Sequence, residues 1–310
     1  MLGAAAIAVS HVAILSSWTD AHFGTIANVI ALGGVVFGFA SVGPLSLRAQ
    51  FQRNVNDGVR HTIAAPLLRD ADIAALPPTV QRYIRPNGAV GQPPMQNSRD
   101  RFHGRIRSGT TARWMPSTGI QCNFYDAPSR WFYMDATMFG VPVKVFHRFV
   151  RPSATMRVKL AALFPRGGPG GPIMDNAETV TLFNDRCVFV PGALISPNIT
   201  RQEIGANTVS AVFTNHTRMV SAVLSINFAG ELTDFVADGR GAVSADGTSF
   251  VEMHWPTPPR DYRAFGVHRT ASHGEDVWHA PADSDAYLEF AVDDVAFNVG
   301  DTERDAKDER

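Results

Sequence analysis

Two carboxylates seven residues apart are the first candidates for chemistry in this chain. Glu178 and Asp185 fall in segment 175–190, where Val180 and Phe183 belong to a set of apolar residues at helical spacing. On a helix this separation places both carboxylates on one face, two turns apart, so they could act as a general acid and base or bind a metal ion. A capping glutamate and a solvent-exposed aspartate are more common, and we favour that interpretation here.

A second polar candidate is the sequence Asp238-Gly-Arg240. Its two charged side chains could form a charge-assisted pair where the chain turns. An Asp-Gly step beside apolar segments is more often a hairpin turn, and we predict that structure at this point. If a polar functional site exists instead, we expect Glu178, Asp185, Asp238 and Arg240 to be its members.

Four histidines near the end of the chain are a third candidate for chemistry. They are His254, His268, His273 and His279. Imidazole groups and the carboxylates nearby are ordinary zinc ligands, and a catalytic zinc site needs about three of them. These histidines fall on different expected strands and loops and match no His-Glu-x-x-His motif, so we expect surface histidines, no metal site and no cofactor. The chain also lacks a Gly-x-Ser-x-Gly sequence, which excludes the usual nucleophile turn of the α/β-hydrolases.

Composition argues against other classes of function. The chain has 310 residues and a net charge of -1, so no general basic character favours nucleic acid as a partner. Its two cysteines, Cys122 and Cys187, fit no zinc or redox spacing. We expect two buried, reduced thiols rather than a disulfide.

Three successive strands between residues 130 and 164 organise the soluble part of the chain. Apolar side chains alternate along each of them, which is the period of a β-strand. The opposite faces of the first two strands also carry large apolar residues, such as Trp131 and Phe146. A sheet that is apolar on both faces needs cover on both, or one face must line a cavity. The expected cavity residues are Phe132, Met134, Val143, Val145, Met156 and Val158, with Trp255 at the rim.

Strand patterns continue through residues 98–299, interrupted by the expected helix at 175–190. This order predicts an α+β protein, mainly antiparallel β, in which a curled half-barrel sheet carries one inserted helix. Residues 47–97 are expected to form a helical linker before the half-barrel domain. The highly charged residues 300–310 are expected to be a disordered tail.

Residues 1–46 predict a membrane segment of one or two transmembrane helices. No Asp, Glu, Lys or Arg occurs from position 21 to 47, and this stretch is long and apolar enough to span a bilayer. The uncharged residues 1–19 are less hydrophobic, and we interpret them as a first span. Arginines at positions 48, 53, 60 and 69 follow the second segment. The positive-inside rule therefore predicts an inner (cytoplasmic) membrane protein with its soluble body on the cytoplasmic side.

Several runs of residues carry a resemblance to a known family. They are residues 20–28, 176–195, 208–215, 230–235 and 255–258, with the pairs Gly274-Glu275 and Trp278-His279. Together they resemble an uncharacterised, domain-of-unknown-function family of bacterial membrane-anchored proteins, and the resemblance covers nearly the whole chain. This chain departs from the family pattern at Ala177 and Arg201. The family's domain is similar in outline to the half barrels of bacterial lipoprotein carriers, which implies a concave apolar face.

Three hypotheses for function follow. The first is a membrane-anchored binding module that holds a membrane lipid or an apolar small molecule in the half-barrel cavity. The second is an enzyme of unassigned class that uses Glu178, Asp238, Arg240 or the late histidines. The third is a membrane scaffold whose transmembrane helix pairs with a helix of another protein, because glycines at 33, 34 and 38 allow close approach.

Overall fold

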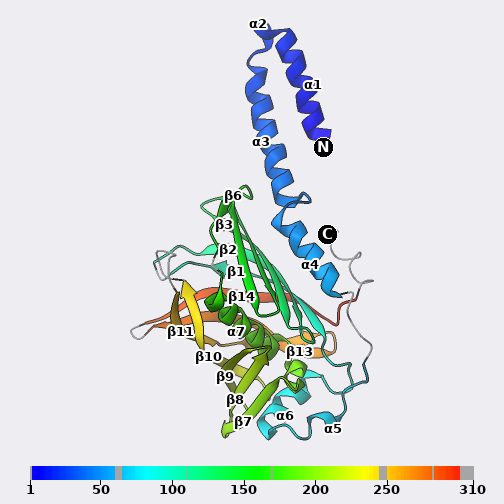
Figure 1. The fold of residues 1–310 in the computed structure, drawn as a ribbon, viewed down its shortest axis with the longest axis vertical. Helices are drawn as coiled ribbons and strands as arrows, with labels where there is room; N and C mark the ends of the chain where they lie inside the picture. Colours follow the sequence, from blue (N-terminus) through cyan, green and yellow to red (C-terminus); the bar gives the residue numbers. More distant parts are fainter. Residues whose placement is uncertain are drawn as a thin grey trace.

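The computed structural model describes residues 2–59, 65–109, 111–168, 170–243, 250–280 and 283–300. Within these ranges the chain forms a helical hairpin that projects from a β-rich body (Figure 1). The expected disordered tail lies outside the described residues, except for Gly300.

The hairpin consists of α1 (Leu2–Ser16), the short α2 (Trp18–Ala21) and α3 (Gly24–Val42). Helices α1 and α3 lie side by side and antiparallel (Figure 1). A Cβ atom at Gly24 would come within 2.8 Å of Ile14 Cδ1, so the glycine permits this close approach. Among the described residues, the helical run Gly24–Val59 is long and apolar enough to cross a membrane, whereas α1 is shorter.

A short break joins the hairpin to α4 (Leu47–Val59). Ser46 caps α4, because its Oγ accepts a hydrogen bond of 3.1 Å from the amide of Ala49. Arg53 Nη1 donates a hydrogen bond of 2.7 Å to the carbonyl oxygen of Pro44, which ties α4 back to the break. Apolar residues of α4 then pack on the outer face of the sheet. There Phe51 lies 6.1 Å from Tyr133, measured between ring centroids.

One antiparallel sheet contains all the strands that the structure describes. The first six are β1 (Asn97–Ile106), β2 (Met115–Phe124), β3 (Ser129–Met138), β4 (Val141–Val150), β5 (Ser153–Leu160) and β6 (Phe164–Arg166). The others are β7 (Ile199–Gly205), β8 (Thr208–Asn215), β9 (Arg218–Ile226), β10 (Leu232–Val243), β11 (Phe250–Thr257), β12 (Arg260–Phe265), β13 (His268–Ala280) and β14 (Asp283–Phe297). The strand order is β6-β5-β4-β3-β2-β1-β14-β13-β11-β10-β9-β8-β7, and β12 pairs with β13 off this path. The sheet curls into a half barrel (Figure 1).

Helix α7 (Pro172–Phe189) lies on the concave side of the curled sheet (Figure 1), and the 3-10 helix η2 (Pro191–Ile195) follows it. The far end of the body is closed by α5 (Asp70–Ile73), α6 (Pro78–Ile84) and the 3-10 helix η1 (Arg85–Asn87). Tyr83 of α6 is fully buried and donates a hydrogen bond to the carbonyl oxygen of Cys187. Part of the expected linker therefore packs into the core of the body.

The sequence-based fold class is confirmed: the body is a mainly antiparallel half barrel with an inserted helix. Both faces of strands β3 and β4 are covered, as expected from their apolar residues. The outer face meets α4 through a cluster that includes Phe51, Trp131 and Phe146, and the inner face meets α7 and a cavity. Cys122 and Cys187 are both buried free thiols.

The hairpin turn predicted at Asp238-Gly-Arg240 is wrong. These residues lie inside β10, where the pairing with β11 shifts between Ala237 and Arg240. Gly239 has a φ of +78°, which suits the extra residue of a β-bulge. Because β10 is paired on both sides, with β9 and β11, the chain continues as a strand here despite the local turn signal of Asp238-Gly239.

Candidate functional site

A central cavity of about 130 Å³ lies between α7 and the concave face of the sheet. Its lining comes from β1, β2, β3, β4, β10, β11, β13 and β14 as well as from α7. The helix and the curled sheet together therefore create the cavity. The lining divides into an apolar wall and a charged end.

Aromatic and aliphatic side chains form the apolar wall. Phe102 of β1 stacks on Phe132 of β3, with ring centroids 5.8 Å apart, and lies 6.1 Å from Phe290 of β14. Ile106 and Met134 also line this wall. Such a surface favours the hydrocarbon part of a ligand.

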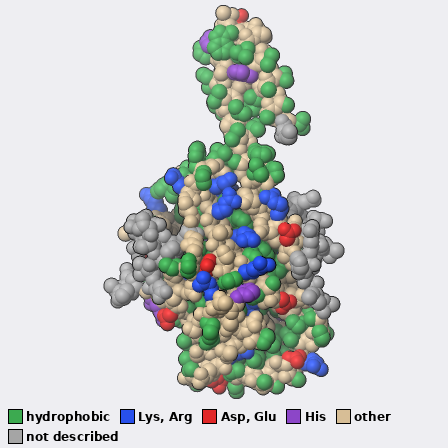
Figure 2. Space-filling view, in the orientation of Figure 1, with side chains coloured by type: hydrophobic (Ala, Val, Ile, Leu, Met, Phe, Trp, Pro, Cys, Tyr) green, Lys and Arg blue, Asp and Glu red, His purple; other side chains and the backbone are tan. Residues whose placement is uncertain are grey.

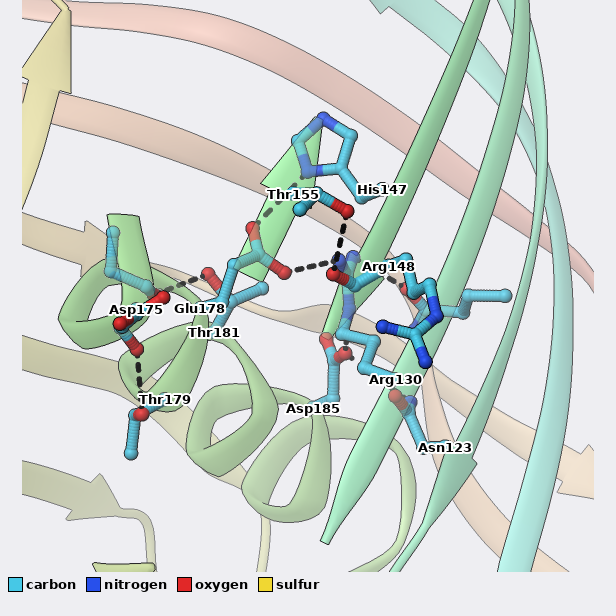
Figure 3. A network of polar contacts seen from close by, with 12 residues as sticks. Asn123, Arg130, His147, Arg148, Thr155, Asp175, Glu178, Thr179, Thr181 and Asp185 are labelled. Atoms are coloured by element: carbon cyan, nitrogen blue, oxygen red, sulfur yellow. Dashed lines mark hydrogen bonds and ion pairs between the residues drawn. The ribbon is translucent and has the colours of Figure 1, made fainter. Parts of the chain in front are cut away.

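Arg130 of β3 is the centre of a buried ionic network at the charged end (Figure 3). Its Nε donates a hydrogen bond of 2.8 Å to Asp185 Oδ2, and its Nη1 donates one of 3.1 Å to Glu178 Oε2. His147 Nδ1 of β4 lies 3.2 Å from Glu178 Oε1. The expectation of a capping glutamate and a solvent-exposed aspartate is therefore wrong. Both carboxylates are buried, because they face the concave side of the sheet, where Arg130 of β3 and His147 of β4 reach them.

The pKa values of the two carboxylates bound by Arg130 shift in opposite directions. Burial would raise the pKa of Glu178, but the charge of Arg130 and the hydrogen bond from His147 lower it to about 2. Burial raises the pKa of Asp185, although Arg130 opposes this shift. Burial alone would lower the pKa of Arg130, but the two carboxylates outweigh it and raise that pKa. Glu178 is thus ionised and Arg130 stays charged at neutral pH.

Arg240 of β10 provides a second cation in the lining. Its guanidinium carbon lies 4.1 Å from the ring centroid of Trp255 and 4.9 Å from that of Trp278. Its Nη1 donates a hydrogen bond of 2.9 Å to Tyr287 Oη, and its Nε donates one of 3.3 Å to Thr181 Oγ1. Among the described residues, no carboxylate oxygen lies within 4.0 Å of Arg240, in contrast to Arg130. This guanidinium is held by aromatic rings rather than by an acid.

Asp276 of β13 contributes a third carboxylate to the cavity. It accepts a hydrogen bond of 3.1 Å from Tyr287 Oη. Burial raises the pKa of Asp276 to about 6, although the charge of Arg240 opposes this shift. Tyr287 thus connects Asp276 with Arg240, because its Oη donates to the carboxylate and accepts from the guanidinium.

A further buried carboxylate, Asp100 of β1, lies behind the lining. Its Oδ2 accepts a hydrogen bond of 3.0 Å from Gln121 Nε2, and Gln121 Oε1 accepts one of 2.9 Å from Arg130 Nη2. Burial raises the pKa of Asp100 to about 7, against the hydrogen bond from Gln121. Its Oδ1 has no hydrogen-bond partner among the residues that the structure describes. Asp100 therefore reaches Arg130 through Gln121, and its pKa lies near neutrality.

The structure brings only some of the proposed site residues together. Those that line the central cavity are Phe132, Met134, Trp255, Glu178, Asp185 and Arg240. Val143, Val145, Met156 and Val158 share an apolar cluster with Phe132 and Met134 but lie outside the lining.

The remaining candidates lie away from the cavity. Asp238 is exposed on the bulge of β10 and pairs with His254 at 2.7 Å. His279 stands opposite His254 on the neighbouring strand, whereas His268 is buried and His273 pairs with Asp261. Within the described ranges, no group of three or more His, Cys, Asp and Glu residues has the arrangement of a metal site.

Sequence reasoning missed several residues of the charged end, chiefly Arg130 and Asp276. One signal was available for Arg130, because it precedes Phe132 by two residues and so points to the same face. The same signal is weaker for Asp276, because Trp278 follows it by two residues but the register of β13 shifts between Asp276 and Val277. Its position depends on the pairing of β13 with β14.

Comparison with known proteins gives a family. Residues 66–290 match the model of a family of unknown function, DUF6544. The chain belongs to this family. The resemblance to a family of unknown function is thus confirmed. No curated protein matches the chain.

One solved structure is similar to this DUF6544 protein. It is a proposed outer membrane lipoprotein-sorting protein domain from Vibrio parahaemolyticus, at 10% sequence identity and a TM-score of 0.36. The match covers 66% of this chain and 86% of that chain.

Proposed function

We propose that this protein is a membrane-anchored binding module whose central cavity holds an anionic, lipid-like ligand. The division of the cavity into an apolar wall and a charged end carries this proposal. Phe102 and Phe290 provide the wall for a hydrocarbon chain, and Arg240 provides a cation for a headgroup. Ligand sites of this kind combine mostly apolar linings with a few fixed polar groups.

The volume of the cavity limits how much of a ligand it encloses. At about 130 Å³ it is close to the roughly 150 Å³ of an engineered apolar cavity that accepts benzene. A complete long acyl chain exceeds this space. We therefore propose that the cavity holds a headgroup and the first carbons of a fatty acid, or a short amphiphile.

The charge of the headgroup follows from the difference between the two arginines. Arg130 is already neutralised by Glu178 and Asp185, at 3.1 and 2.8 Å. Arg240 has aromatic rings and hydroxyl groups around it, and no described carboxylate within ion-pair distance. A ligand carboxylate would complete its hydrogen bonds and offset the cost of burying its charge. The apolar, lipid-like ligand expected from the sequence is thus proposed to carry a negative charge.

The helical run Gly24–Val59 supports the membrane anchor in this proposal. Large apolar side chains such as Val29, Ile30 and Phe39 are exposed on α3, where a bilayer would cover them. Arg48 and Arg53 follow α3 directly and are exposed on α4, which favours a body on the cytoplasmic side.

Thermal unfolding of the full chain in lipid nanodiscs, followed by tryptophan fluorescence, tests the ligand proposal. We expect octanoate to raise the melting temperature, and octanol and octylamine of the same chain length to leave it nearly unchanged. At a ligand concentration of about 100 times Kd, binding adds about 2.7 kcal/mol to the free energy of unfolding. Equal stabilisation by octylamine, or none by octanoate, would contradict the proposal.

Two variants and their matched controls locate the site. Arg240→Gln should remove the octanoate shift, whereas Arg260→Gln, at an exposed position on β12, should keep it. Ile106→Trp should fill the apolar wall and block the shift. Val143→Trp is its control, because Val143 lies in the same apolar cluster as Ile106 but outside the lining. Each shift is measured against the same variant without ligand.

A further inference from the structure

We infer that the turns β3–β4 and β5–β6 form a second membrane contact, which docks on an anionic phospholipid bilayer beside α3. We call this surface the rim, and it consists of Phe139, Val141, Leu163 and Phe164. The inference rests on the membrane anchor proposed above. It adds a surface of the half barrel that the anchor does not require.

The contacts of α4 show that the rim faces the same way as the hairpin. Near the end of α4, a Cβ at Gly58 would meet Trp131 at 3.0 Å, whereas Phe51, one turn from its start, packs on Tyr133. Moving along β3 from Trp131 to Tyr133 therefore leads toward the start of α4 and the base of α3. At about 3.3 Å per residue, Phe139 lies roughly 20 Å beyond Tyr133 in that direction. Figure 1 shows β3 and β6 ending beside the junction of α3 and α4.

A backbone hydrogen bond brings the second turn next to the first. The amide of Ala161 donates to the carbonyl oxygen of Pro142 across 2.7 Å. Leu163 and Phe164 therefore lie beside the β3–β4 turn. The two turns form one continuous edge of the sheet.

Exposure of the rim is unusually high for large apolar side chains. Phe139 is 78% exposed, Phe164 62%, and Val141 and Leu163 37% each. Single exposed apolar residues need no explanation, but a group of four at one edge marks an interaction surface. Aromatic side chains in particular favour the interface between lipid and water.

The conformation of the β3–β4 turn supports a role for Phe139 outside folding. The turn has two central residues, Phe139 and Gly140, with φ of 51° and 80°. Two-residue hairpin turns of this kind favour Asn or Asp followed by Gly, because positive φ is unfavourable for bulky side chains. A strained, exposed phenylalanine is thus not explained by the needs of the turn.

The charge near the rim complements an anionic bilayer. Six Lys and Arg residues lie between positions 136 and 174. Lys144, Lys159 and Arg166 lie on the parts of β4, β5 and β6 nearer the rim, where Lys144 pairs with Asp135 at 2.6 Å. Arg148 and Arg151 lie toward the β4–β5 turn at the other end. Arg157 and Arg166 are exposed in this segment, and Arg48 is exposed at the start of α4. Arg113 reaches the rim from the β1–β2 turn, 5.9 Å from the ring centroid of Phe139. Figure 2 shows Lys and Arg side chains gathered on the body below the neck. Basic residues around an apolar edge are the usual pattern of a surface that binds anionic lipids.

A fluorescent probe on the full chain tests the docking. Phe139→Cys is labelled with an environment-sensitive dye and reconstituted in vesicles of equal parts phosphatidylcholine and phosphatidylglycerol. Cys122 and Cys187 are buried and should remain unlabelled. The matched control is Phe228→Cys, because Phe228 is also 78% exposed but lies by Arg82 of α6, at the end of the body opposite the hairpin. We expect lipids with a quenching group on the acyl chain to roughly halve the signal at position 139 and to leave position 228 unchanged.

The outcomes separate docking from anchoring. A chain that floats with the vesicles but shows no quenching at position 139 overturns the rim and leaves the anchor in place. A chain that does not float overturns both. Equal quenching at positions 139 and 228 also overturns the rim as a specific surface. In vesicles of phosphatidylcholine alone we expect at least a twofold smaller effect at position 139, and an unchanged effect would contradict the choice of anionic lipid.

Discussion

Arg130 on β3 and Asp185 on α7 are joined by a hydrogen bond of 2.8 Å that is buried on both sides. It connects the sheet to the inserted helix across 55 positions of the sequence. The same guanidinium binds Glu178, two turns earlier on the same face of α7, at 3.1 Å. A buried ion pair adds little net stability when it forms, because both charges lose their water. Removing only one partner of the pair is costly, because the remaining charge stays buried without a partner.

We predict that Arg130→Met lowers the free energy of unfolding by about 3–5 kcal/mol, because two carboxylates lose their cation. Denaturant unfolding of the full chain in detergent measures this loss. Replacing the carboxylates as well, with Glu178→Gln and Asp185→Asn, should recover much of it. Arg148→Met is the control: Arg148 is exposed on the neighbouring strand, and we expect a change below about 1 kcal/mol. Equal losses at both arginines would contradict the importance of the buried network.

Asp100 should make the fold less stable as pH rises through the neutral range. Its pKa rises from 3.8 to about 7 in the folded state because of burial. Below about pH 4 both the folded and unfolded chains hold this proton. Between about pH 4 and pH 7 the unfolded chain loses the proton first, so unfolding becomes more favourable. Asp276, with a pKa of about 6, acts with the same sign.

Glu178 acts in the opposite direction and at lower pH. Its pKa of about 2 lies below the ordinary value of 4.5, so its contribution to stability is lost as pH falls through that window. Together these groups predict a maximum of stability near pH 4–5, measured as the melting temperature against pH. Asp100→Asn should flatten the decline between about pH 4 and pH 7 by an amount on the order of 4 kcal/mol. A decline that persists unchanged in this variant would contradict the assignment to Asp100.

The strands were largely predictable because their signal is local. Alternating apolar residues predicted three strands between residues 130 and 164, and the structure has Ser129–Met138, Val141–Val150 and Ser153–Leu160. The helix expected at 175–190 is Pro172–Phe189. The apolar wall was predictable in part for the same reason, since Phe132 and Met134 share a face with period two.

The charged end was not predictable in the same way, because it depends on contacts between distant segments. Glu178 looks like a residue of an exposed helix start until β3 and β4 are placed against it. Arg240 follows an Asp-Gly step that signals a turn, and only the neighbouring strands make it part of a bulge. Asp276 of β13 belongs to the site because Tyr287, on the neighbouring strand β14, donates a hydrogen bond to it. Local patterns carry no information about such pairings.

Membrane topology gives a further prediction. Four arginines, at positions 48, 53, 60 and 69, follow the apolar segment, and Asp20 precedes it. We expect the body to be cytoplasmic, so a green fluorescent reporter fused after Gly300 should fluoresce in cells. Alkaline phosphatase fused at the same point should be inactive. The reverse pattern would show a periplasmic body and would contradict this topology.

The β3–β4 turn should be more stable with a residue that its backbone favours. Phe139 has a φ of 51° and is 78% exposed, so its side chain contributes little packing to offset the strain. We predict that Phe139→Asn raises the free energy of unfolding by about 0.5–1 kcal/mol, because Asn tolerates positive φ in a two-residue turn before Gly140. The variant should at the same time weaken the contact of the rim with lipid.

Thermal unfolding in detergent, where no bilayer is present, measures the change in stability separately from the change in lipid contact. Phe228→Asn, at an equally exposed position, is the control and should not be stabilised by this mechanism. A loss of stability in Phe139→Asn would show that the phenylalanine packs usefully in the fold and would remove one reason to assign it to the membrane.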